Sequence, residues 1–164
     1  MGPTRRTALA ALAGATLLGL AACTSSGYPA DPEGTLDRIS GGTLRAGVVH
    51  HPPHVDAGGA EPAGPEPDLI RSFAAAHGAE VEWTVTGEEA LMTALQKGDV
   101  DLVAGGLTSD SPWTTHASLT RDYAEAAGSD GEPVKLVMAV PPGENQMLAA
   151  LEAHLDAQAR EAGR

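Results

Sequence analysis

Residues 43–104 alternate between short apolar runs and amphipathic stretches, and this alternation restricts the chain to few folds. The runs at 43–49, 80–85 and 100–104 have the composition of strands, and apolar residues at helical spacing lie between them. Strands joined by helical crossovers pair in parallel, with right-handed connections. The sequence therefore predicts an α/β sheet with the strand order second–first–third.

The helix boundaries are predicted from the residues at the ends of each amphipathic stretch. Asp68 has the side chain of a helix cap, and Gly78 marks the end of the first helix. Residues 86–89 (Thr-Gly-Glu-Glu) have the spacing of a capping box and predict the start of the second helix, which ends at Gly98.

The rest of the chain adds a fourth strand and a final helix to this pattern. Residues 134–140 form an apolar run, and residues 144–160 carry an apolar stripe at helical spacing. The predicted fold class is a single three-layer α/β lobe, with a mostly parallel sheet of four to five strands and helices on both faces. Aromatic residues make up only 3% of the chain, so we expect its core to be built from small side chains.

Residues 1–22 are predicted to be a lipoprotein signal peptide. Arg5 and Arg6 precede an apolar run at 8–20, and the sequence Leu-Ala-Ala-Cys at 20–23 resembles the bacterial lipobox. That resemblance implies that Cys23, the only cysteine of the chain, is lipidated. The alternative is an ordinary secretory signal with a chance cysteine, and both Sec and Tat export remain open.

Three segments are therefore predicted: a signal peptide at 1–22, a flexible tether at 23–42 that is rich in Gly, Ser and Pro, and a lobe at 43–164. We expect an extracytoplasmic protein, held to the bacterial cell membrane by its lipid. The formal charge of −12 argues against a nucleic-acid partner, since phosphate contacts need Lys and Arg.

Several local motifs are similar to those of bacterial extracellular solute-binding proteins of family 3, the lipid-anchored receptors of amino-acid ABC transporters. These are Gly-Pro-Glu-Pro-Asp-Leu at 64–69, Leu-Gln-Lys-Gly-Asp-Val-Asp at 95–101 and Gly-Gly-Leu-Thr at 105–108. Leu-Thr-Arg-Asp-Tyr at 119–123 shows a weak similarity to the Phe-Ser-x-Pro-Tyr motif of the family. The resemblance implies a lobe of the periplasmic-binding-protein type II kind that binds an amino acid or a similar small polar solute, with an ABC permease as a possible partner.

Two departures from the family pattern bear on function. Family members have two lobes, whereas a turn lies between Tyr123 and Val134, where the second lobe is expected. The family also places an arginine after the glycine-led loop to hold the carboxylate of the ligand, and Trp113 takes that place here. A single open lobe predicts weak solute binding, because it leaves much of the ligand uncovered. The alternative, suggested by both departures, is an interaction or structural lipoprotein whose solute site has decayed.

The candidate ligand-binding residues are Gly105, Gly106, Thr108, Trp113 and His54. They lie in loops after the first and third strands, where parallel sheets bind ligands. Thr108 offers a hydroxyl to a polar solute or simply caps a turn. Trp113 offers an aromatic platform to a ligand or covers the end of the sheet.

A metal site is the third hypothesis, based on the imidazoles of His50, His51, His54 and His116. Exposed loop histidines are the alternative explanation for this cluster. The sequence contains no Gly-x-Ser-x-Gly elbow, phosphate loop or interpretable nucleophile–base pair. We therefore predict a protein that is not an enzyme and has no cofactor.

Overall fold

Strand β1 (Thr43–Val48) lies at the centre of the parallel part of the sheet in the computed structural model, which describes residues 29–163. It pairs in parallel with β2 (Glu80–Val85) along its whole length and with β3 (Leu102–Ala104) at its end. The predicted order second–first–third is confirmed. Strand β2 forms one edge of the sheet, which agrees with its alternating polar and apolar residues.

Two further strands extend the sheet to the order β2-β1-β3-β7-β4. Strand β7 (Ala139–Val140) is antiparallel to β3, and β4 (Ser118–Leu119) is antiparallel to β7. The predicted α/β class and strand number are confirmed, but the sheet is mixed instead of mostly parallel. The physical reason is the connection that precedes β7, since the chain enters it from a hairpin and not from a helical crossover.

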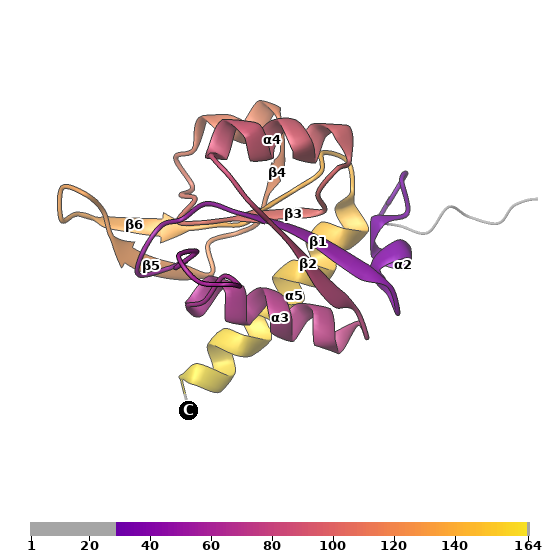
Figure 1. The fold of residues 1–164 in the computed structure, drawn as a ribbon, viewed down its shortest axis with the longest axis horizontal. Coiled ribbons are helices and arrows are strands. Elements are labelled where there is room, and N and C mark those ends of the chain that lie inside the picture. The colour runs from indigo at the N-terminus through magenta and orange to yellow at the C-terminus, as the bar shows by residue number, and fades with distance from the viewer. Residues whose placement is uncertain (1–28, 164) are drawn as a thin grey trace, which may run out of the picture.

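The hairpin consists of β5 (Ala124–Ala127) and β6 (Pro133–Leu136) and projects from one end of the lobe (Figure 1). It stands where the family resemblance implies the second lobe. The run 134–140 is therefore two strands instead of one. The chain changes partners after Leu136, because the N–H of Val137 already bonds to the carbonyl of Leu107 at 2.9 Å.

Helices cover both faces of the sheet, with α4 (Glu88–Lys97) on one side and α3 (Pro65–Ala76) and α5 (Asn145–Ala162) on the other (Figure 1). Leu102 and Ala104 pack in the core with α3 and α5, whereas Val103 packs in the core with α4. Consecutive apolar residues in β3 are thus explained by burial on both faces.

Both predicted helix starts need correction. Helix α3 begins at Pro65 after Gly64, so Asp68 lies inside its first turn and does not cap it. Helix α4 follows Gly87 and has no side-chain cap. Because the cap residue is Gly87 and not Thr86, the capping box expected between Thr86 and Glu89 does not form. The Glu88 carboxylate accepts a hydrogen bond from the Trp113 indole.

Residues 31–42 differ from the predicted tether because they pack onto the lobe. Helix α2 (Thr35–Ile39) buries Thr35 and Ile39. Asp31 accepts hydrogen bonds from the N–H groups of Leu36 in α2, at 2.9 Å, and Met147 in α5, at 3.4 Å. One carboxylate therefore caps two helices. The predicted signal peptide and Cys23 lie outside the described residues.

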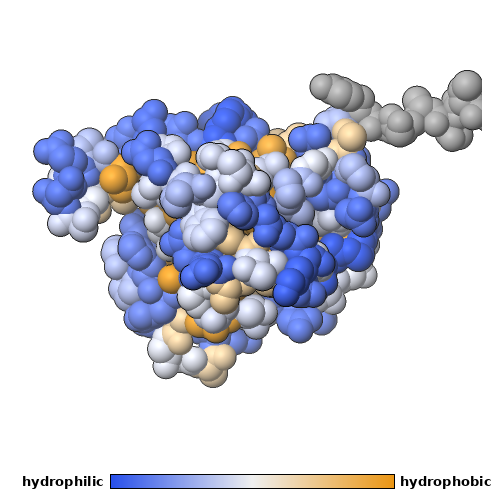
Figure 2. Space-filling view, turned by 90° about the horizontal axis from the view of Figure 1, so that it is seen from above, coloured by the Kyte–Doolittle hydropathy of each residue, from blue (hydrophilic) through white to orange (hydrophobic). Residues whose placement is uncertain are grey.

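In the described part of the chain, no helix is both long and apolar enough to cross a membrane. The face above α4 is mainly hydrophilic, and its hydrophobic residues form small separate patches (Figure 2).

Candidate ligand-binding site

The loops that follow β1 and β3 meet at the carboxyl end of the parallel strands. The N–H of Val49 bonds to the carbonyl of Ala104 at 3.0 Å, which brings the two loops together. Gly105 has φ +135°, and a Cβ there would lie 2.7 Å from the Val49 nitrogen. Only glycine allows this close approach of two backbones.

Gly106 links the second loop to the start of α3. Its N–H donates to the Glu66 carboxylate, 3.1 Å from Oε2, and the His51 ring lies against its Cα. Glu66 is only 1% exposed, although it belongs to the first turn of α3. The partial positive charge at the start of α3 favours a carboxylate at this position.

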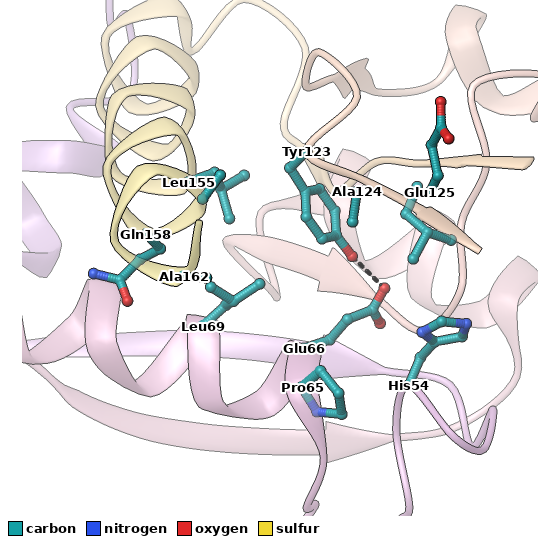
Figure 3. Close-up of a pocket in the computed structure, with 12 residues that line it drawn as sticks. His54, Pro65, Glu66, Leu69, Tyr123, Ala124, Glu125, Leu155, Gln158 and Ala162 are labelled. Carbon is teal, nitrogen blue, oxygen red and sulfur yellow. Dashed lines mark hydrogen bonds between the residues drawn. The ribbon is translucent and has the colours of Figure 1, made fainter. Parts of the chain in front are cut away.

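Tyr123 is the second donor to Glu66, with its hydroxyl 2.5 Å from Oε1 (Figure 3). Burial raises the pKa of the Tyr123 hydroxyl, and the negative charge of Glu66 raises it further. Tyr123 therefore remains a protonated donor at neutral pH. Among residues 29–163, no basic side chain forms an ion pair with Glu66.

A cavity of about 410 Å³ lies beside this carboxylate, between α3, α5 and the hairpin. Figure 3 shows Leu69 rising from α3 and Leu155 reaching in from α5, with the Tyr123 ring opposite them. The apolar wall is made by Pro65, Leu69, Ala124, Leu136, Leu155, Ala159 and Ala162, and the polar groups by His54, Glu66, Tyr123, Glu125 and Gln158.

The structure brings only some of the predicted ligand residues to this cavity. His54 lines it, and Gly106 reaches it through Glu66. Thr108 instead forms an isolated antiparallel bridge with Leu136, and its carbonyl accepts the Ser111 N–H at 2.9 Å. Its local role is thus that of a turn residue beside β6.

Trp113 lies on the face of the sheet that α4 covers. It belongs to the 3₁₀ helix η1 (Pro112–Thr115), packs against the α4 side of the core and donates its indole N–H to Glu88. Trp113 is half-buried and does not line the cavity. This placement agrees with a covering role at the end of the sheet.

The metal hypothesis finds no site in the part of the chain that the structure describes. There, no three His, Cys, Asp or Glu side chains are grouped so that they could hold an ion. The rings of His51 and His54 stack at 5.7 Å, and His50 Nδ1 accepts the Ala57 N–H at 3.0 Å. The His116 ring meets the Trp113 ring edge-on, with the ring centroids 5.6 Å apart. These histidines are engaged in local contacts.

Glu66 and Tyr123 are the residues that the prediction of a binding site missed. Both belong to stretches that resemble the family, at 64–69 and 119–123. That resemblance was the available signal. They lie 57 positions apart in the sequence, and nothing in the sequence indicated that the two side chains meet.

A second hollow, of about 500 Å³, lies at the opposite end of the sheet. Asp101, also 1% exposed, is paired there with two guanidinium groups, from Arg38 and Arg45, each at 2.5 Å. Burial alone would raise the pKa of Asp101, but the hydrogen bonds from Arg45 and Arg38 outweigh it and hold this pKa below its usual value.

Taken together, the mixed five-stranded sheet and its two covering layers define an α/β domain of the periplasmic-binding-protein kind. The family model for bacterial extracellular solute-binding proteins, family 3, matches residues 44–161. The chain belongs to this family.

Solved structures show the same fold at low sequence identity. A point mutant of the arginine-bound form of domain 1 from TmArgBP is 21% identical over 76% of this chain and 98% of that chain, with a TM-score of 0.68. An ancestral cationic amino acid solute-binding protein is 15% identical over 79% and 95%, with a TM-score of 0.67. The unliganded L-cystine solute receptor of Neisseria gonorrhoeae is 13% identical over 77% and 92%, with a TM-score of 0.64. A comparison with curated proteins gave no match.

Proposed function

We propose that this protein is a lipid-anchored, extracytoplasmic receptor that binds an amino acid or a similar small polar solute for an ABC permease. The observation that carries the proposal is the cavity at the carboxyl end of the sheet, where buried Glu66 faces apolar walls. Ligand pockets typically have volumes of about 300–1,000 Å³ and combine apolar walls with a few placed polar groups.

Single-domain binding has support from a structural neighbour. Domain 1 of TmArgBP, which shares this fold, is described as arginine-bound. We propose that this lobe also binds its solute alone. Binding is expected to be weak, because an open lobe leaves more of the ligand in water than the enclosed pockets of tight binders do.

Isothermal titration with a panel of amino acids and small amines tests solute binding. We expect dissociation constants of about 0.1–1 mM, which correspond to about 4–5.5 kcal/mol of binding free energy. Micromolar dissociation constants would contradict the expectation that a single open lobe binds its solute weakly. Absence of binding by every solute would contradict the function and favour an interaction or structural lipoprotein.

A pair of tryptophan substitutions on α5 locates the bound solute. Ala159 lines the cavity, whereas Ala149 is exposed on the same helix and does not line it. We expect Ala159→Trp to abolish binding by filling the cavity and Ala149→Trp to leave binding unchanged. Equal effects of the two substitutions would exclude the cavity as the site.

Lipid anchoring is tested separately from solute binding. We propose that Cys23 is acylated after removal of residues 1–22. Metabolic labelling with palmitate should label the wild-type protein and leave Cys23→Ala unlabelled. A labelled Cys23→Ala variant would refute acylation at this residue.

A further inference from the structure

The charged groups around the cavity are strongly biased toward one sign. Its lining contains two carboxylates, Glu66 and Glu125, and no lysine or arginine. His54 is the one basic side chain among the lining residues. The whole chain carries a formal charge of −12, and such a field attracts cations and repels anions.

Glu66 differs from Asp101 in how its charge is balanced. Asp101 has two guanidinium partners, whereas the donors to Glu66 are an amide N–H and a phenolic O–H, both neutral. A buried carboxylate without a cationic partner is costly. A ligand cation at Glu66 would supply the missing charge.

The rest of the cavity fits an aliphatic body. Leu69, Leu136 and Leu155 form the wall beside Glu66, and the small side chains Ala159 and Ala162 leave space along α5. The Tyr123 ring lies over the same space (Figure 3), and aromatic faces attract cations. The ligand thus requires a positive end and an apolar stem.

A ligand carboxylate finds no comparable partner in this cavity. None of the lining residues carries a guanidinium or an ammonium, and the indole N–H of Trp113 is already bonded to Glu88. Bringing a carboxylate out of water without a partner costs several kcal/mol. In this open cavity an ordinary amino acid would bear part of that cost together with repulsion from Glu66 and Glu125, whereas its decarboxylated counterpart would bear neither.

We propose that the solute is an organic cation without a carboxylate, an aliphatic amine or guanidine, whose charged end binds Glu66 in the cavity between α3, α5 and the β5–β6 hairpin. This proposal narrows the proposed function and rests on it.

Agmatine and L-arginine make the matched pair of probes, because agmatine is arginine without the carboxylate. We expect agmatine to bind the full protein at least about tenfold more tightly than L-arginine. L-glutamate should show no binding in the same titration. Tighter binding of L-arginine than of agmatine would overturn the proposal.

The substitution Glu66→Gln tests the contact while keeping the shape of the side chain. We expect it to weaken agmatine binding about tenfold or more, and Glu89→Gln, an exposed site on α4, to change nothing. Unchanged agmatine affinity in Glu66→Gln would overturn the assignment. Thermal unfolding of each variant reports whether it folds. If Glu66→Gln does not fold, agmatine binding is compared between Ala159→Trp and Ala149→Trp. Equal agmatine affinity in these two variants would overturn the assignment of the ligand to this cavity.

Failure of the inference and failure of the proposed function look different in these titrations. If L-arginine or another amino acid binds and agmatine does not, the inference fails and the receptor function stands. If neither amines nor amino acids bind, the receptor function fails and the inference fails with it.

Discussion

The two ends of the sheet each bury one carboxylate, and they treat its charge in opposite ways. At the amino end, Asp101 is enclosed by the guanidinium groups of Arg38 and Arg45. At the carboxyl end, Glu66 receives only neutral donors and opens onto an apolar cavity. The comparison teaches that burial of an acid alone does not identify a ligand site. The partners around the acid distinguish a structural ion network from a site that accepts a cation.

The largest expected effect is at the amino end. Asp101→Ala leaves Arg38 and Arg45 without their shared acceptor, and breaking a buried pair costs 3–5 kcal/mol. Because the arginine side chains are 43% and 31% exposed, water replaces part of the loss. We expect the free energy of unfolding to fall by about 3 kcal/mol, as measured by urea denaturation.

Asp99→Asn is the control for this change, because Asp99 is exposed and close in the sequence. Its effect on the free energy of unfolding should stay within about 0.5 kcal/mol.

The lowered pKa of Asp101 predicts how stability depends on pH. The stabilisation from Asp101 is present above the unfolded pKa of 3.8 and is lost as the pH falls through the folded pKa. Asp101→Asn should therefore flatten the acid limb of stability. An acid limb as steep as that of the wild type would contradict the ion network.

The second largest loss of stability is expected for substitutions in the loop after β3, at Gly105 and Gly106. Gly105→Ala forces a Cβ to within 2.7–2.8 Å of Val49 backbone atoms, which cannot move away cheaply, and we expect a loss of about 2–3 kcal/mol. At Gly106, with φ +72°, the three atoms nearest to the Cβ belong to the exposed His51 ring, which can move away, so Gly106→Ala should cost about 1 kcal/mol. Chemical denaturation measures both, and the reverse order would refute this packing of the two loops.

The third largest loss of stability is expected for removal of the Glu66 carboxylate, and it can be compared directly with the loss for Asp101. Glu66→Ala leaves the Gly106 N–H and the Tyr123 hydroxyl without an acceptor, which costs about 1–3 kcal/mol. No cation is stranded, so we expect about 2 kcal/mol, less than for Asp101→Ala. The same urea titrations decide the order. A larger loss than for Asp101→Ala would show that Glu66 is a structural centre of the lobe.

The smallest effect concerns the pairing of α3 and α5 next to the cavity. His154 Nε2 lies 2.8 Å from Ser72 Oγ. The pKa of His154 is lowered, mainly by burial and also by the charge of the neighbouring His77. A lowered pKa means that the folded state disfavours protonation, so stability falls as the pH drops below about 6.5 and through the folded pKa. The melting temperature should decrease between pH 7 and pH 5, and less so in His154→Gln. An equal decrease in both proteins would exclude His154 as the cause.

The central part of the fold could be predicted because its signals are local. Helical crossovers between strands specify parallel pairing, and Gly78 and Gly98, with φ +64° and +73°, lie where the helices were predicted to end. Two motifs of the family resemblance, at 64–69 and 95–101, overlap these same elements. Local patterns of this kind depend on neighbouring residues alone.

The parts that were missed depend on contacts between distant residues. The pattern at 86–89 gave no sign that the cap would be Gly87, or that Glu88 would bond to Trp113, 25 residues away. The predicted tether became part of the lobe because Glu144 accepts the N–H of Thr35, 109 residues earlier. The candidate site differs from the predicted one for the same reason. The histidines are close together in the sequence, whereas Glu66 bonds to Gly106 and Tyr123, which are distant in the sequence.

The contacts of the first described residues with α5 limit how far the lobe could move from a lipid anchor at Cys23. The carbonyl of Ala30 accepts the N–H groups of Asn145 and Gln146 at 2.8 and 3.2 Å, so the chain is fixed to α5 from residue 30. Under the proposed acylation, seven Cα–Cα steps join Cys23 to this point and span at most about 25 Å. An acylated lobe would then stay close to the bilayer surface. A membrane protein within that radius meets it at a high effective concentration, which favours a low-affinity partnership over long-range capture.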